Sequence, residues 1–211
     1  MIIAVSTRVT EAQNYLEKRN SIAFDFISYL ENLGITPLMI PNNLKDLNNY
    51  LSAFKIKGII LTGGNNVDPK KYKSLSHLSD VYPERDETEK ILFNYAIDKE
   101  LPILGVCRGF HFINAELGGK LTHDISGHVN INHILVSSKS NYNKKEVNSF
   151  HNHGIKNNQL SNKLNCLANT NDGFVEVYEN KIAKILGFQW HPERYYNEFD
   201  SNLIKKHFAI K

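Results

Sequence analysis

The chain has 211 residues, of which 41% are hydrophobic, and this is enough for one domain with a substantial apolar core. Its 25 basic and 22 acidic side chains leave a formal net charge of +3. That charge is too small to predict nucleic-acid binding, and neither a basic stripe nor an aromatic stacking motif accompanies it.

Cysteine usage and hydropathy point to a single cytoplasmic domain over residues 1–211. Cys107 and Cys166 are too few for a disulfide framework, and a reducing compartment keeps such thiols free. No apolar run approaches membrane-spanning length, and residues 1–5 lack the features of a signal peptide. We therefore expect neither membrane nor nucleic-acid partners, while a homo-oligomer stays open. The weakly basic balance leaves room for an anionic small molecule.

Strands and helices alternate through the first half of the chain. The apolar spacing predicts strands over residues 2–5, 37–40, 56–61 and 101–106. It predicts helices over residues 22–33, around 47–54 and over 86–100, the first of them ending at Gly34. Alternation of this kind requires crossover connections, which favour a parallel sheet with helices on both faces.

The second half of the chain has a different pattern, in which predicted strands follow one another. Strands are predicted over 131–136, 174–178 and 182–190, the last two joined by a turn at Glu179 and Asn180. A polar surface loop is expected over 137–145, and a final helix over about 200–208. The predicted fold class is therefore α/β, with an open, mostly parallel sheet, helices on both faces and an antiparallel C-terminal portion.

The sharpest local motif is Gly105-Val106-Cys107-Arg108-Gly109, which lies between a buried strand and a helix. Small residues two positions either side of a nucleophile permit the tight strand-to-helix turn that exposes its side chain. Cys107 would also lie at a helix N-terminus, where the partial positive charge favours a thiolate. On this pentapeptide alone, a catalytic cysteine and a structural one are equally good interpretations.

A second motif, Gln189-Trp190-His191-Pro192-Glu193, favours the interpretation of Cys107 as a catalytic residue. A cysteine hydrolase needs a base for the thiol proton and a third group that orients the base. A carboxylate beside the histidine orients the imidazole and stabilises the imidazolium. We therefore predict Cys107, His191 and Glu193 as a catalytic triad.

A third motif is the glycine turn Leu61-Thr62-Gly63-Gly64-Asn65, at the end of an apolar strand. Ligands of open α/β sheets bind outside the carboxyl ends of the strands, at the edge where Cys107 would also emerge. Glycines there allow backbone amides to approach an oxyanion. The amides of Gly64 and Arg108 are the predicted oxyanion hole.

These three motifs, in this order, resemble those of class I glutamine amidotransferases, and especially their γ-glutamyl-γ-aminobutyrate hydrolase-like branch. The resemblance covers nearly the whole chain and includes Arg85-Asp86 with Glu89, Val147 to His151, and Asp172-Gly173 with Val175-Glu176. It implies a flavodoxin-like sheet, a γ-glutamyl thioester on Cys107, and neither a metal nor an organic cofactor. The substrate-binding residues that it implies are Gly63, Asn148, Ser149 and His151.

Two positions depart from the branch. His111 replaces a glutamine that often follows the nucleophile, and His151-Asn152-His153 replaces the usual His-His-Gln. These positions lie near the expected substrate and bear on its leaving group. In its length and in the residues of its motifs, the chain is most similar to family members that act on γ-glutamyl-CDP-amidate in capsular polysaccharide phosphoramidate synthesis. This similarity implies release of glutamate and cytidine diphosphoramidate.

Other functions stay open at this point. The chain could hydrolyse γ-glutamyl-γ-aminobutyrate or a γ-glutamyl polyamine, or supply ammonia to a synthase on a separate chain. A catalytically inactive binding module is disfavoured by the intact triad. Arg8, Arg19 and Arg85 are candidates for phosphate contacts and equally for surface charges.

The histidines suggest one further alternative, a zinc hydrolase. His151 and His153 are two residues apart, so on a strand they would share one face and could meet one metal ion. His123, His128 and His133 precede them in the chain. No carboxylate stands at a telling spacing, so the sequence favours structural or surface roles, and we expect no metal.

Overall fold

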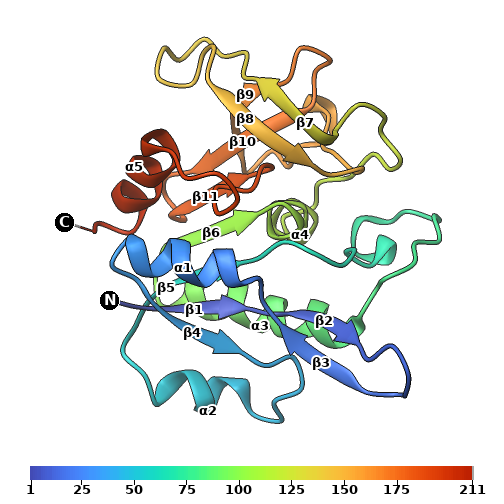
Figure 1. The fold of residues 1–211 in the computed structure, drawn as a ribbon, viewed down its shortest axis with the longest axis vertical. Helices are drawn as coiled ribbons and strands as arrows, with labels where there is room; N and C mark the ends of the chain where they lie inside the picture. Colours follow the sequence, from blue (N-terminus) through green and yellow to red (C-terminus); the bar gives the residue numbers. More distant parts are fainter. Residues whose placement is uncertain (211) are drawn as a thin grey trace.

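The computed structural model describes residues 1–210, so Lys211, the last residue of the predicted domain, lies outside the described residues. A seven-stranded sheet forms its centre (Figure 1). The strand order is β4 (Thr36–Ile40), β1 (Ile2–Ser6), β5 (Ile56–Leu61), β6 (Ile103–Val106), β11 (Ile185–Phe188), β10 (Val175–Asn180) and β9 (Asn165–Asn169). The first five strands pair in parallel, and β10 and β9 pair antiparallel.

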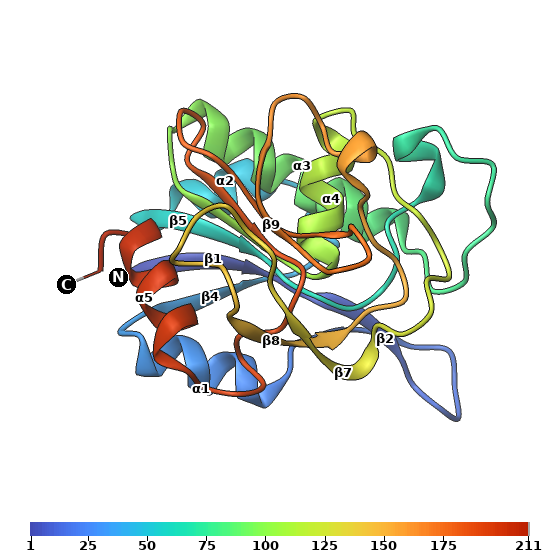
Figure 2. The same cartoon turned by 90° about the horizontal axis from the view of Figure 1, so that it is seen from above.

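Helices cover both faces of this sheet (Figure 2). One face carries α1 (Phe24–Asn32) and α5 (Glu198–His207). The other carries α2 (Leu47–Ser52), α3 (Pro83–Asp98) and α4 (Arg108–Glu116). Each layer buries its own apolar cluster, as alternating strands and helices require. The predicted α/β fold class is confirmed.

Two hairpins stand outside the main sheet. One joins β2 (Arg8–Glu11) to β3 (Lys18–Ser21), and the other joins β7 (Val129–Ile134) to β8 (Glu146–Phe150). The β7–β8 hairpin lies against the C-terminal strands, because a bridge pairs Val136 with Asn169 of β9. Figure 1 shows the hairpin beside β10, and an ion pair joins His133 of β7 to Glu176 of β10. This placement brings β8 next to the loop that follows β11.

Most predicted elements are confirmed, including the surface loop over 137–145. The turn expected at Glu179 and Asn180 is wrong, because β10 continues through both residues and the turn occupies 181–184. Helix α3 begins three residues early, at Pro83, since proline suits the first helical position. Two short 3₁₀ segments also form, at Pro69–Tyr72 and Asn157–Gln159. Within residues 1–210, the helices are all too short or too polar to cross a membrane.

Candidate active site

Cys107 occupies a strained turn between β6 and α4. Its φ of +51° lies in the left-handed region, which non-glycine residues rarely adopt. The backbone amide of Cys107 donates to the carbonyl of Phe188 at 2.8 Å, and this bond ties the turn to the end of β11. Only 9% of the Cys107 residue is exposed. The turn thus presents a nearly buried thiol at the N-terminal end of α4.

The flanking glycines are required by close packing. A Cβ on Gly105 would lie 2.7 Å from the backbone of Gly109 and from the side chain of Ile113. A Cβ on Gly109 would meet the backbone of Leu61 on the neighbouring strand. Both predicted small positions therefore allow α4 to begin against the sheet without pushing the turn outward.

His191 follows β11 and is paired with Glu193, as predicted from the sequence. Its Nδ1 lies 2.6 Å from Glu193 Oε1. Burial alone would disfavour the imidazolium, but the charge of Cys107 and its hydrogen bond, together with Glu193, raise the pKa of His191 to about 10. A Cβ on Gly63 would lie 2.8 Å from His191 Cε1 and 3.5 Å from Cys107 Cβ, so the histidine and cysteine lie side by side across this glycine.

Asn148 of β8 fixes the backbone of His191. Its Oδ1 accepts from the His191 amide at 3.0 Å, and its Nδ2 donates to the His191 carbonyl at 2.7 Å. The sequence predicted Asn148 as a substrate-binding residue, and the structure places it behind the histidine instead of along the cavity. The pairing links the β7–β8 hairpin to the proposed base, and no short-range sequence pattern could have indicated it.

The glycine turn is held from the α3 side by Arg85. The guanidinium of Arg85 donates to the carbonyls of Thr62 at 2.8 Å and Gly63 at 3.1 Å, and also to the carbonyl of Gly64. Gly64 has a φ of +79°, and among the bonds of residues 1–210 none is donated by its amide. With its carbonyl held on one side, the amide of Gly64 stays available to an oxyanion.

Arg85 belongs to a buried set of four charged side chains, here called the α3–α4 charge network. Its members are Arg85, Asp86, Glu89 and Arg108. Glu89 is fully buried and accepts from Arg85 Nε at 3.0 Å and from Ser6 Oγ at 2.9 Å, while Arg108 pairs with both carboxylates. The i, i+4 spacing of Arg85 and Glu89 was visible in the sequence, but their tertiary partners were not. Because the Arg108 side chain is engaged by both carboxylates, its backbone amide is the candidate oxyanion donor.

A cavity of about 360 Å³ opens in front of the thiol. Seven of the predicted site residues line it, namely Gly63, Gly64, Cys107, Arg108, His151, His191 and Glu193. Ser149 does not line it, since Ser149 is fully buried and its hydroxyl donates to the carbonyl of His128 at 2.6 Å.

Arginine side chains complete part of the cavity wall. Arg8 and Arg194 line it, and Arg194 stacks on the ring of Phe150 with its guanidinium 4.0 Å from the centroid. Arg85 is fully buried, and Arg19 pairs with Glu17 on the β2–β3 hairpin. Of the three arginines considered for phosphate contacts, Arg8 alone therefore reaches the cavity.

His111, the departure one turn after the cysteine, also lies at the cavity wall. Its Nε2 lies 2.7 Å from Gln189 Oε1, and burial lowers the pKa of the His111 ring well below its ordinary value. A neutral imidazole at this position adds a polar group to the wall without adding charge.

Comparison with known proteins places this site in a family. Residues 1–193 match the family described as Peptidase C26. The chain is 35% identical over 192 residues to YvdE of Lactococcus lactis, a candidate glutamine amidotransferase-like protein, covering 80% of this chain and 78% of the relative. It is 27% identical over 217 residues to the γ-glutamyl-CDP-amidate hydrolase of Campylobacter jejuni, covering 100% of this chain and 98% of the relative.

A solved structure extends the agreement to the fold. The crystal structure of a candidate GMP synthase subunit from Thermoplasma acidophilum superposes with a TM-score of 0.68 and 20% identity. The match covers 100% of this chain and 93% of that chain, and at this identity it concerns the fold alone. The chain therefore belongs to the Peptidase C26 family, the class I glutamine amidotransferase-like hydrolases of amide bonds.

Proposed function

We propose that the protein hydrolyses a γ-glutamyl amide through a thioester on Cys107. The observation that carries this proposal is the meeting of Cys107, the His191–Glu193 pair and the glycine turn at one cavity. A nucleophile, an oriented base and unpaired backbone amides are the parts that acyl transfer needs.

The Cys107–His191 pair holds one proton, which lies on His191 because the pKa of the ring is raised to about 10, and the reaction begins when the Cys107 thiolate attacks the γ-carbonyl carbon. The backbone amides of Gly64 and Arg108 stabilise the oxyanion that forms. His191 then gives its proton to the leaving nitrogen as the C–N bond breaks, and Glu193 stabilises the imidazolium until that transfer. A water molecule, deprotonated by His191, hydrolyses the thioester and releases glutamate.

For the leaving group, we propose cytidine diphosphoramidate, released from γ-glutamyl-CDP-amidate during capsular polysaccharide synthesis. The relative from Campylobacter jejuni whose name gives this substrate aligns along the full length of both chains. The exposed guanidinium groups of Arg8 and Arg194 line the cavity and suit a diphosphate, although Asp25 and Asp80 line it too. The free thiols of Cys107 and Cys166 fit a reducing cytoplasm.

A substrate panel tests this proposal. Glutamate release is measured from glutamine, γ-glutamyl-γ-aminobutyrate, a γ-glutamyl polyamine and γ-glutamyl-CDP-amidate at equal concentrations. We expect kcat/KM to favour the nucleotide by about a thousandfold, or roughly 4 kcal/mol at about 1.4 kcal/mol per tenfold. A preference for the aminobutyrate or polyamine compound would assign the protein to those substrates. A preference for free glutamine would indicate an ammonia-supplying subunit.

A matched pair of arginine variants locates the preference. Arg194→Gln should reduce kcat/KM for the nucleotide about tenfold or more while leaving the value for glutamine nearly unchanged, because only the nucleotide presents phosphate oxygens. Arg19→Gln, on the exposed β2–β3 hairpin, should alter neither value. Equal losses on both substrates in Arg194→Gln would contradict a phosphate contact at this residue.

A further inference from the structure

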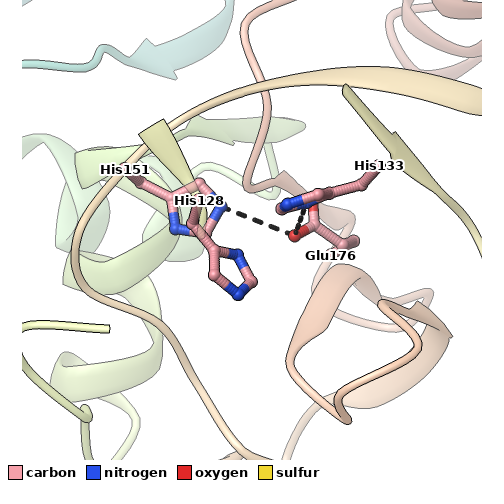
Figure 3. Close-up of side chains that lie close together, drawn as sticks. All are labelled: His128, His133, His151 and Glu176. Carbon is pink, nitrogen blue, oxygen red and sulfur yellow. Dashed lines mark hydrogen bonds and ion pairs between the residues drawn. The ribbon is translucent and has the colours of Figure 1, made fainter. Parts of the chain in front are cut away.

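Four buried side chains that can each bind a metal ion gather between the β7–β8 hairpin and β10. They are His128, His133, His151 and Glu176, here called the histidine cluster (Figure 3). Their exposed fractions are 2%, 8%, 4% and 0%, and one nitrogen or oxygen from each lies within 4.8 Å of the others. In Figure 3, dashed lines join the rings of His133 and His151 to the carboxylate of Glu176, and the His128 ring lies beside His151.

The distances within the cluster suit a small ion. Glu176 Oε1 lies 3.2 Å from His133 Nδ1 and 3.5 Å from His151 Nε2. In a tetrahedral zinc site with bonds of about 2.1 Å, neighbouring ligand atoms lie roughly 3.4 Å apart. Two edges of the tetrahedron are thus close to this length, and the remaining distances between ligand atoms are 4.8 Å or less.

Hydrogen bonds outside the cluster fix which ring nitrogens face inward. His128 Nε2 donates to Asp172 Oδ2 at 2.9 Å, so Nδ1 carries the lone pair. His151 Nδ1 donates to the carbonyl of His153 at 2.8 Å, an arrangement in which Nε2 of the neutral ring carries the lone pair. A histidine that ligates a metal normally donates its other ring N–H to a carboxylate or a backbone carbonyl in this manner.

Three atoms of the cluster lack hydrogen-bond partners among the described residues. Within residues 1–210, His128 Nδ1, His151 Nε2 and Glu176 Oε2 are buried and accept or donate no hydrogen bond. The ion pairs of Glu176 Oε1 with His133 at 3.2 Å and with His151 at 3.5 Å place two imidazoles beside one carboxylate oxygen, and they give none of these three atoms a hydrogen bond. Buried polar atoms without partners are costly, and a cation bound by His128 Nδ1, His151 Nε2 and the Glu176 carboxylate would offset that cost.

We propose that the histidine cluster binds a divalent transition-metal ion, with zinc the best fit to three imidazoles and one carboxylate. Four protein ligands leave no open coordination position, which is the pattern of a structural site. The ion would join the β7–β8 hairpin to β10, because His133 lies on β7, His151 follows β8 and Glu176 lies on β10. His151 would then support the cavity wall through the metal and would not contact substrate.

Metal content tests the site without reference to catalysis. The full chain is expressed with added zinc, freed of loose ions by gel filtration and analysed by mass spectrometry for metals. We expect about one zinc ion per chain, and a Co²⁺-exchanged sample should show the intense visible bands of tetrahedral coordination. Treatment with a chelator should lower the melting temperature, and zinc should restore it.

Variants separate this site from adventitious binding. Glu176→Gln and His128→Ala should lose most of the bound zinc and the visible cobalt bands, whereas His77→Ala, at an exposed histidine, should retain both. Wild-type protein with less than roughly 0.1 zinc per chain and no tetrahedral cobalt spectrum would overturn the proposal. Full metal content in a folded Glu176→Gln variant would overturn it as well. If that variant does not fold, the wild-type cobalt spectrum decides.

Discussion

The α3–α4 charge network and the histidine cluster form two flanks of the cavity, to whose wall they contribute Arg108 and His151, and they differ in how completely their polar atoms are paired. The network holds two guanidinium groups and two carboxylates, so its charges cancel, and within residues 1–210 only its Arg108 Nε lacks a partner. The cluster holds one carboxylate among three imidazoles and leaves three atoms without partners. The first flank is almost fully paired within the protein, and the second is the one for which we propose a bound cation.

The two flanks meet at His191. Gly63, whose carbonyl is held by the network through Arg85, lies against the histidine ring. Asn148, from the β7–β8 hairpin that also carries His133, holds the histidine backbone. Substitutions in either flank should therefore affect His191, through Gly63 in the first case and through Asn148 in the second.

Replacing the base itself should have the largest effect. His191→Asn should lower kcat by roughly 10⁴-fold, because the thiol loses its base and the leaving nitrogen its acid. Steady-state glutamate release measures this. Glu193→Gln should cost less, since it removes the group that orients the imidazole and keeps the imidazole itself. A larger loss in Glu193→Gln than in His191→Asn would reverse the proposed roles.

Disrupting the α3–α4 charge network should mainly lower the stability of the fold. Glu89→Gln leaves two buried guanidinium groups with the single carboxylate of Asp86, so we expect a loss of about 3–5 kcal/mol in the free energy of unfolding. Denaturant unfolding measures this loss. Glu87→Gln, at an exposed position of the same helix, is the control and should change stability little. Equal stability of the two variants would show that the network contributes nothing.

Removing the contacts between the β7–β8 hairpin and His191 should lower kcat. Asn148→Ala removes both bonds to the His191 backbone, so we expect kcat to fall about 10- to 100-fold with a small change in KM. Asn132→Ala, which removes an exposed amide on the same hairpin, should leave kcat unchanged. A rise in KM at constant kcat in Asn148→Ala would instead support the substrate contact predicted from the sequence.

The smallest expected effect is a change in the pKa of the His191 ring. Because the pKa of His191 is raised to about 10, the ring stays protonated at neutral pH and loses its proton as the pH rises through that value. Cys107 contributes two of the effects that raise this pKa, so in Cys107→Ala the ring should release its proton at lower pH. NMR titration of the His191 ring in both proteins measures the difference. Identical titration curves would place the thiol too far from the ring.

Local patterns explain which parts of the site could be predicted from the sequence. The cysteine turn, the His191–Glu193 pair and the glycine turn each occupy a few consecutive residues, and parallel strands bring them to one edge of the sheet. The roles of Asn148 and Glu176 depend on how the β7–β8 hairpin lies against the C-terminal strands, which no short spacing records.

The missed elements have a related cause. The β2–β3 hairpin is mostly polar and exposed, so no alternation of apolar residues indicated Arg8–Glu11 or Lys18–Ser21 as strands. The carboxylate that the histidines required stands 25 residues beyond His151 in the chain, and only the fold brings it to them.

The nucleophile can be identified directly by covalent labelling. A γ-diazoketone analogue of glutamine is incubated with the protein, and the labelled peptides are found by mass spectrometry. Thioester chemistry at the cavity predicts a single adduct per chain, carried by Cys107, with loss of activity in proportion to labelling. Cys107→Ala should fold normally, take up no label and release no glutamate. An adduct on Cys166 with Cys107 unmodified, or turnover that persists in Cys107→Ala, would contradict the proposed mechanism.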